Sequence, residues 1–281
     1  MPRPNVSVVV PFSGDSASAG RLRASLEQLE RGQADELIVA DNSKRPAFEP
    51  SAEVGAVRAA GERSSYATRN AGAAAASGAW ILFIDADCVP VPDLIGAYLD
   101  SPPADGVGAL AGVVATAPTQ RHFLARYASD RGFLDQETGL HTADDAAATA
   151  NLMVRREAFE QIGGFTEGIR SGGDVDFCRR LVAAGWRIER RPEAWVHHLH
   201  RESLPDLLGQ VARYAAGARW LNDRYPGTAP RWPLGRGLIH CGRDIAADLA
   251  NRRFERAAFR GVDALSMFAH NFGYRRSNAA G

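Results

Sequence analysis

The sequence predicts an α/β fold in which a mostly parallel central sheet is flanked by helices. A β-branched run at Val6–Phe12 and an apolar run at Glu36–Ala40 are typical of strands, and leucines at helical spacing lie between them at positions 22, 26 and 29. This order forms a βαβ unit, which builds parallel sheets. The apolar run Trp80–Ile84 is typical of a strand buried on both faces of such a sheet. Ligands of open α/β sheets bind at the carboxyl ends of the strands.

The first loop, residues 13–20, is made of small residues but has no G-x-G-x-x-G pattern, which disfavours a dinucleotide-binding site. Gly32 ends the first helix where a C-terminal cap is expected. The second strand runs directly into Asp41. This aspartate could be only a turn residue, but its place at a strand carboxyl end makes contact with a nucleotide base or ribose the competing interpretation.

Arg69 lies near the start of an alanine-rich helix that opens at Tyr66–Gly72 (YATRNAG) and ends at Ser77-Gly78. Alanine favours the helix and allows it to pack closely on the sheet. The guanidinium of Arg69 is either a solvated surface charge or a cation that faces a phosphate. The sequence leaves both interpretations open.

Two aspartates, Asp85 and Asp87, follow the buried strand 80–84. If the strand geometry persists, their spacing sends both carboxylates to one side, where they repel each other unless a cation lies between them. Carboxylate oxygens suit Mg²⁺ or Mn²⁺, which would in turn bind substrate phosphates. The alternative is that Asp85 ends the strand and Asp87 caps a turn before Pro90.

The second half of the chain predicts further strands and helices. Residues 115–148 have weak periodicity and are interpreted as connections with one short helix near Phe123–Tyr127. The other expected elements are strands at Val107–Val114, Thr149–Val154, Trp186–Arg191 and Ala194–His198, and helices at Arg155–Ile162 and Leu204–Leu221.

Asp174 and Asp176 open another predicted helix, whose apolar positions share one face up to Gly185. Acids at a helix N-terminus are often simple dipole partners, and this interpretation is strong for Asp176. It is weaker for Asp174, because the preceding Gly172-Gly173 would let the backbone bring its carboxylate close to a ligand.

We expect one main domain at residues 1–225. Pro226–Gly237 is the best candidate linker. A mostly helical extension at 226–281 follows it, with its main helical stretch at Ile239–Phe272. It carries several arginines among apolar residues, and such a mixture permits at most peripheral membrane contact.

The 281 residues, 45% of them hydrophobic, can bury a sizeable core. The 33 basic and 33 acidic side chains balance, so the net charge does not suggest a nucleic-acid partner. Cys88, Cys178 and Cys241 form no CxxC pair, which argues against a zinc site or a disulfide framework. No apolar stretch approaches the ~20 residues that span a bilayer, so we expect a cytoplasmic protein, at most peripheral at the inner face of the membrane.

Taken in order, these stretches resemble glycosyltransferase family 2, the inverting transferases of GT-A fold, over roughly residues 6–203. Each motif alone is weak, but their joint order is specific. Besides Val6–Phe12, the matching stretches are Ile38–Ser43 (IVADNS), Tyr66–Gly72 (YATRNAG), Ile84–Cys88 (IDADC), Thr149–Arg155 (TANLMVR), Gly163–Phe165 and Gly173–Leu181 (GDVDFCRRL).

The resemblance makes residues 1–225 a GT-A catalytic domain, with a nucleotide-sugar half at about 1–115 and an acceptor half at about 116–225. It also implies a role for each matching polar residue. It makes Asp85-Ala86-Asp87 the DXD motif that holds Mn²⁺ or Mg²⁺ and the diphosphate, and it makes Asp174 the general base. His198, with His197 as its rival, would complete the metal shell. The substrate-binding residues implied are Pro11, Asp41, Arg69, Asp85, Asp87 and Asn151. Family members commonly carry Glu-Asp where this chain has Gly173-Asp174, which puts the acceptor contacts of that glutamate in doubt.

The expected reaction moves a sugar from a nucleotide-diphosphate sugar to an acceptor hydroxyl on a saccharide, a lipid-linked glycan or a small molecule. Two rivals from other classes remain open. One is a GT-A-like sugar-phosphate nucleotidyltransferase, although the first loop lacks a glycine- and lysine-rich phosphate cradle. The other is a catalytically silent sugar-nucleotide-binding protein.

Overall fold

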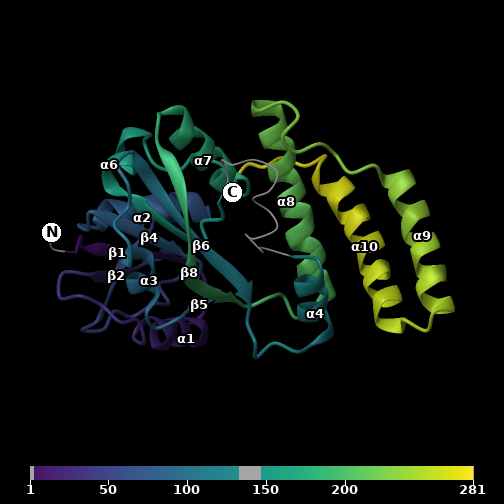
Figure 1. Ribbon diagram of the computed structural model, residues 1–281, viewed down its shortest axis with the longest axis horizontal. Helices are drawn as coiled ribbons and strands as arrows, with labels where there is room; N and C mark the ends of the chain where they lie inside the picture. The colour runs from purple at the N-terminus through teal and green to yellow at the C-terminus, as the bar shows by residue number, and fades with distance from the viewer. Residues whose placement is uncertain (1–2, 133–146, 281) are drawn as a thin grey trace.

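The structure is a computed structural model that describes residues 3–132 and 147–280, and its centre is one eight-stranded sheet (Figure 1). The strand order is β3-β2-β1-β4-β7-β6-β8-β5. The strands are β1 (Val6–Phe12), β2 (Glu36–Asp41), β3 (Val54–Arg58), β4 (Trp80–Ile84), β5 (Cys88–Pro90), β6 (Val107–Thr116), β7 (Asn151–Arg155) and β8 (Arg187–His198).

The sheet is parallel on one side of β4 and mixed on the other. Strands β3, β2, β1 and β4 are all parallel, as the βαβ pattern predicts. Beyond β4, β7 runs antiparallel to both β4 and β6, and β5 runs antiparallel to β8, while β6 and β8 are parallel. The expectation that β4 lies in a parallel sheet is therefore right for one neighbour only. Its predicted burial on both faces is confirmed, because no residue of β4 is more than 3% exposed.

Helices cover both faces of the sheet. Apolar residues of α1 and α3 join one core cluster, and those of α2, α6 and α7 join another on the opposite face. The helices are α1 (Ser16–Leu26), α2 (Ser65–Ala75), α3 (Leu94–Leu99), α4 (Phe123–Asp130), α6 (Arg156–Gln161), α7 (Gly173–Ala183), α8 (Leu204–Arg224), α9 (Leu234–Ala250) and α10 (Phe254–Gly273).

Four details differ from the sequence-based expectation. The sequence pattern missed β3, an edge strand with mostly exposed side chains, and β5, which has three residues. The two strands predicted around Pro192 are one strand, β8, whose register with β6 shifts between Arg190 and Trp195. A bulge of this kind accommodates a proline that cannot donate a ladder hydrogen bond. Helix α9 also starts inside the predicted linker. Part of the loop region predicted at 115–148, residues 133–146, lies outside the described residues.

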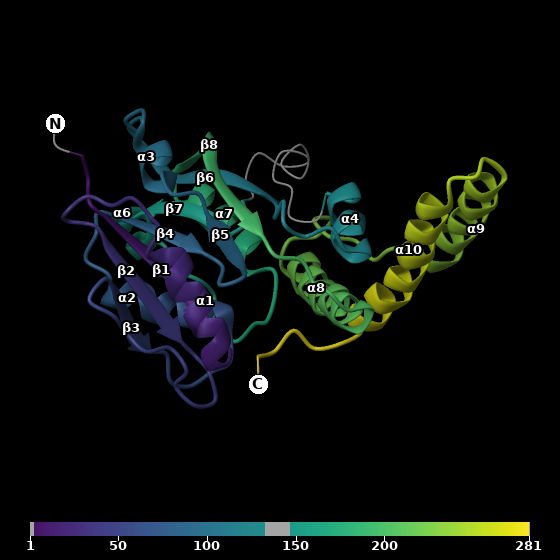
Figure 2. The ribbon, with the colours of Figure 1, turned by 90° about the horizontal axis from the view of Figure 1, so that it is seen from below.

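The C-terminal helices extend away from the sheet and then the chain returns to it. Helix α8 lies against the sheet domain, α10 packs beside α8, and α9 is outermost (Figures 1 and 2). Beyond α10, the Asn278 amide donates to Ser171 O and the Arg170 N–H donates to Asn278 O, both at 2.9 Å. The tail therefore braces the loop that precedes α7. No helix among the described residues has the length and apolarity needed to cross a bilayer.

Candidate active site

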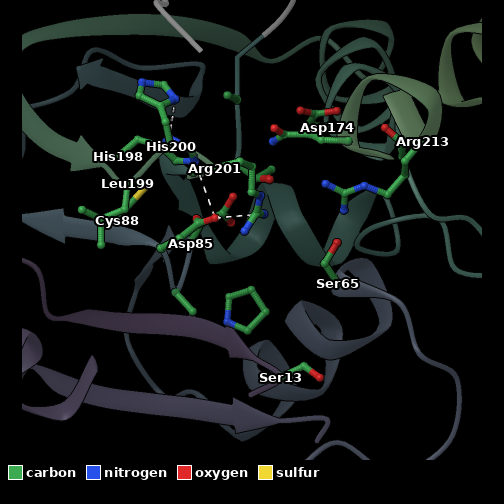
Figure 3. Close-up of a pocket in the computed structure, with 18 of the residues that line it drawn as sticks. Ser13, Ser65, Asp85, Cys88, Asp174, His198, Leu199, His200, Arg201 and Arg213 are labelled. Carbon is green, nitrogen blue, oxygen red and sulfur yellow. Dashed lines mark hydrogen bonds and ion pairs between the residues drawn. The ribbon is translucent and has the colours of Figure 1, made fainter. Parts of the chain in front are cut away.

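A cleft of about 1270 Å³ opens where several carboxyl ends of the strands meet. Its lining comes from the end of β1, the turn between β4 and β5, the starts of α2 and α7, the end of β8 and the inner face of α8. Figure 3 shows His198 and His200 on one side of this cleft and Asp174 and Arg213 on the other. The cleft therefore lies where ligands of open α/β sheets are expected to bind, at the carboxyl ends of the strands.

Arg69 and Asp85 form an ion pair in the lining of the cleft. The Arg69 side chain is only 4% exposed, so the interpretation as a solvated surface charge is wrong. The guanidinium also lies 5.6 Å from the ring centroid of Tyr66 and 5.9 Å from that of Phe165. Two aromatic faces and a carboxylate therefore hold this cation in place within the cleft.

Asp87 faces a different set of cations. Its Oδ2 lies 3.6 Å from His198 Nε2 and 3.4 Å from Arg201 Nη2. Burial alone would raise the pKa of Asp87, but the contact with His198 and the charges of His198 and Arg201 outweigh it and hold the pKa below its ordinary value. Asp87 is therefore an ionised carboxylate at neutral pH.

The histidine pair behind Asp87 is buried. His198 Nδ1 lies 3.3 Å from His200 Nδ1, and Thr116 Oγ1 lies 2.9 Å from His200 Nε2. Burial, together with the neighbouring charge of His198, lowers the pKa of His200 to about 4, so this imidazole is neutral at physiological pH. His197 does not line the cleft, and of the two rivals only His198 faces Asp87.

The donor set at this wall suits a hard divalent cation. Asp85, Asp87 and His198 all line the cleft, and two carboxylates with one imidazole are ligands that Mn²⁺ accepts. Within residues 3–132 and 147–280, no group of three or more such side chains is already drawn together around a metal position. The chemistry of the donors fits, while the ion pairs of Asp85 and Asp87 would have to rearrange for the carboxylates to bind a cation.

Asp174 lines the opposite wall at the start of α7. The preceding Gly172 has a φ of 84°, a left-handed conformation that favours glycine. Burial raises the pKa of Asp174, and the charge of Asp85 adds to this, although the Val175 N–H and the charge of Arg69 oppose it. This carboxylate is thus a stronger base than an ordinary aspartate.

The structure explains why residue 173 is glycine. A Cβ at this position would lie 2.7–2.8 Å from carbons of the Tyr66 ring, closer than packed atoms approach. Tyr66 is 6% exposed and lines the cleft beside Asp174. A glutamate at 173, as in the motif of relatives, therefore has no room while Tyr66 occupies this space.

Asp176 points away from the cleft, into the protein. It is fully buried and accepts hydrogen bonds from Thr166 Oγ1 at 2.7 Å and Tyr225 OH at 2.8 Å. Arg180 and Arg224 each contribute an ion pair at 2.9 Å. Asp176 thus ties α7 to the end of α8, which fits a structural role.

Two predicted substrate-binding residues do not reach the cleft. The carboxylate of Asp41 accepts three backbone hydrogen bonds from Ser43, Ala47 and Phe48, the geometry of the turn-residue alternative. The amide of Asn151 is fully buried and is hydrogen-bonded by the protein itself, to Tyr98 OH, Val113 O and Ala194 O; a substrate contact for either residue stays a prediction.

The other predicted site residues do come together around the cleft, and the structure adds several that sequence reasoning missed. Pro11, Arg69, Asp85, Asp87, Asp174 and His198 all line it. Among the polar residues missed are Tyr66, Arg201, Asp206, Gln210, Arg213 and Tyr214. A usable signal was present for α8, because positions 206, 210 and 213–214 recur at helical spacing and are polar on an otherwise inward-facing side.

Comparison with known proteins agrees with this geometry. Residues 2–217 match the model of glycosyltransferase-like family 2. A pre-mycofactocin glycosyltransferase of Mycobacterium tuberculosis is 30% identical over 277 residues, covering 90% of this chain and 58% of the relative. The chain thus spans little more than half the length of that relative. Glycosyltransferase AglE of Haloferax volcanii is 28% identical over 195 residues, covering 66% of this chain and 64% of AglE.

Solved structures with the same architecture include two transferases. The mannosyltransferase PcManGT from Pyrobaculum calidifontis, solved with GDP-Man and Mn²⁺, has a TM-score of 0.58 at 16% identity and covers 97% of this chain and 72% of its own. GalNAc-T7, solved with UDP, GalNAc and Mn²⁺, has a TM-score of 0.53 at 15% identity over 72% of this chain and 45% of its own. These likenesses confirm the predicted GT-A fold. The family match over residues 2–217 shows that the chain belongs to glycosyltransferase family 2.

Proposed function

We propose that the chain is a metal-dependent inverting glycosyltransferase that moves a sugar from a nucleotide-diphosphate sugar to an acceptor hydroxyl. The observation that carries this proposal is the pairing of two walls in one cleft. Asp85 and His198 line one wall and Asp174 lines the other (Figure 3), and Asp87 lies beside His198 on the first wall. The family membership supports the sugar transfer, and the facing walls support this division of labour.

The first wall is suited to a diphosphate. A divalent cation, Mn²⁺ or Mg²⁺, would be held by Asp85, Asp87 and His198 and would supply charge that stabilises the departing diphosphate. PcManGT and GalNAc-T7, both solved with Mn²⁺, are consistent with this choice. Arg69 and Arg201 add permanent positive charge to the same wall, where they can contact phosphate oxygens.

The second wall is suited to proton removal. As the acceptor oxygen attacks the anomeric carbon, Asp174 accepts the hydroxyl proton and the bond from that carbon to the diphosphate breaks on the opposite side. One displacement of this kind inverts the anomeric configuration without a covalent enzyme intermediate. Arg213 and Gln210 lie on the α8 side of the cleft, where they can bind acceptor or donor oxygens.

A panel of nucleotide sugars with Mn²⁺ and Mg²⁺ tests the proposal. We expect release of a nucleoside diphosphate and a glycoside whose anomeric configuration, read by NMR, is opposite to that of the donor. Formation of a sugar phosphate and a nucleoside triphosphate in the presence of pyrophosphate would instead show a nucleotidyltransferase. Donor binding by calorimetry with no turnover across the panel and a set of acceptors would show a silent binding protein.

A further inference from the structure

The α9–α10 hairpin exposes large apolar side chains, unlike the sheet domain. Six of the nine large hydrophobic side chains that are strongly exposed among the described residues belong to these two helices. Their exposed fractions are 63% for Ile239, 48% for Leu249, 66% for Phe254, 43% for Leu265, 53% for Phe268 and 58% for Phe272. Such a concentration indicates an interaction surface.

The exposed residues form one stripe along each helix. On α10 the apolar positions 254, 258, 261, 265, 268 and 272 recur every three or four residues, and on α9 positions 239, 242, 246 and 249 do the same. This period keeps each set on one side of its helix. Large apolar side chains stand at both ends of the α10 stripe, at Phe254 and Phe272, and Leu265 lies between them.

Both stripes lie on the same side of the hairpin. The two helices face each other through Met267, which a Cβ on Gly237 would touch, and through Arg260 and Asp244, 3.7 Å apart. On α10 the exposed stripe follows Arg260 and Met267 by roughly a third of a turn. On α9 it follows Cys241, the buried residue of that helix, by a similar angle in the same rotational sense. Because the helices run antiparallel, the two stripes form one surface, here called the outer apolar face (residues 239, 242, 246, 249, 254, 258, 261, 265, 268 and 272).

The charge around the outer apolar face is positive. Residues 234–281 contain eight arginines and four acidic residues, although the whole chain has a formal net charge of zero. Three of the four acids already have arginine partners: Asp244 with Arg260, Glu255 with Arg126, and Asp263 with Arg131. Exposed arginines stand at both ends of the hairpin, at positions 252 and 253 in the loop and at 275 and 276 beyond α10. Arg276 also lies over the Phe272 ring, 4.5 Å from its centroid.

We propose that the outer apolar face docks the protein on an anionic phospholipid surface. The phenylalanines would enter the headgroup region while the arginines at the ends contact lipid phosphates, which is how amphipathic helices bind at bilayer interfaces. A second copy of the chain fits less well, because two-fold pairing of this face would bring its arginine-rich ends toward each other. This inference concerns where the protein acts and is independent of the proposed transfer reaction.

Vesicle co-sedimentation of the full chain tests the proposal. We expect binding to vesicles rich in phosphatidylglycerol, little binding to phosphatidylcholine vesicles, and weakening at high salt. The triple variant Phe254→Ser, Phe268→Ser and Phe272→Ser should bind at least about tenfold more weakly. Its thermal melt should match that of the wild type, because all three side chains are more than half exposed.

A matched pair of double variants isolates the charge contribution. Arg252→Gln with Arg253→Gln should weaken binding to anionic vesicles about tenfold. Arg45→Gln with Arg63→Gln removes the same charge from exposed positions of the sheet domain and should bind as the wild type does. No binding to anionic vesicles, equal binding to both lipids, or full binding by the triple phenylalanine variant would overturn the proposal. A dimer in sedimentation velocity that the triple variant abolishes would assign the face to a second copy instead.

Discussion

The two walls of the cleft use the same side chain in opposite electrostatic settings. On one wall, Asp85 and Asp87 lie against Arg69, His198 and Arg201, and the pKa of Asp87 is held low. On the other wall, Asp174 has no cation in direct contact among the described residues, and burial raises its pKa.

This difference shows how neighbouring charges and burial set the pKa of a carboxylate and so the role that it can fill. A carboxylate that stays ionised can hold a cation throughout a reaction, whereas one whose pKa is raised binds a proton more readily. The comparison predicts that removing charge from the first wall will abolish donor binding, and that removing it from the second will abolish turnover while donor binding persists.

The largest expected effect is loss of the metal. Chelation with EDTA should abolish transfer, and added Mn²⁺ or Mg²⁺ should restore it, because the first wall would lose the charge that stabilises the diphosphate. Asp87→Ala should lose donor binding as well as turnover, as measured by calorimetry and initial rates. Full activity in the presence of chelator would show that the first wall does not act through a metal ion.

Asp174→Asn should slow transfer by ~10²–10⁴-fold, the usual contribution of general-base assistance. The amide keeps the size of the side chain but cannot accept the proton, and donor affinity measured by calorimetry should stay near normal. A variant with wild-type turnover would show that another group acts as the base.

The same variant has a stability signature. Because the pKa of Asp174 is raised in the folded state, its ionised form is disfavoured there, and the stability it contributes at acid pH is lost as the pH rises through that pKa. At neutral pH and without ligands, Asp174→Asn should therefore melt at the same temperature as the wild type or at a higher one. A clear fall in Tm would contradict the assignment of its raised pKa.

Asp176→Asn provides the contrast two residues away. It should destabilise the fold by about 2–4 kcal/mol, because it leaves Arg180, Arg224, Thr166 and Tyr225 without their anionic partner. The pKa of Asp176 is lowered, so its stabilising effect is present above the ordinary aspartate pKa and is lost as pH falls through the folded-state value. Thermal melts across pH measure this. If a well-folded Asp176→Asn protein loses turnover while Asp174→Asn stays active, the roles of the two aspartates are exchanged.

Asp41→Ala probes a carboxylate outside both walls. Losing a hydrogen bond to a charged group corresponds to roughly 1.5–3 kcal/mol, so we expect a ten- to hundredfold loss of affinity for the bare nucleoside diphosphate and for the whole donor alike. Unchanged affinity in a folded variant would leave Asp41 as a turn residue, held by its three backbone partners and by Arg58 at 3.8 Å.

The smallest expected effect is a displaced pH profile. Transfer should fall at acid pH as Asp174 takes up its proton, and the fall should begin at a higher pH than for an ordinary aspartate. Donor affinity should persist into that range, because the pKa of Asp87 is shifted the other way. If donor affinity and turnover instead fall together with pH, the two walls do not differ in their protonation as proposed.

Local patterns predicted most of the fold and much of the candidate site. The strands at Val6–Phe12 and Trp80–Ile84 are visible because buried runs are continuous and β-branched. The same reasoning placed Asp85 directly after a strand and Asp174 at the start of a helix, as the structure has them. The direction of β7 beside β4 was not predictable, because pairing depends on contacts between distant segments and not on local periodicity.

The finer assignments at the site depended on such distant contacts as well. Arg69 was ambiguous in the sequence because its partner Asp85 and the Phe165 ring become neighbours only in the fold. Gly173 was visible as a departure from the family pattern, but its cause, the ring of Tyr66, is more than a hundred residues away. The polar positions 206, 210 and 213–214 of α8 recur at helical spacing, so their shared face was visible in the sequence.

The contact between the tail and the loop before α7 sets an order of events during synthesis. Asn278 and Ser171 are 107 positions apart, and the Ala280 N–H also donates to Gly168 O at 3.0 Å. Contacts of such long sequence separation close late, and a chain emerging from the ribosome folds its N-terminal part first. The parallel strands and the turn between β4 and β5 can therefore assemble while translation continues. The loop that precedes Asp174 gains its full set of contacts only after residue 280 has left the exit tunnel, so this side of the cleft is completed last.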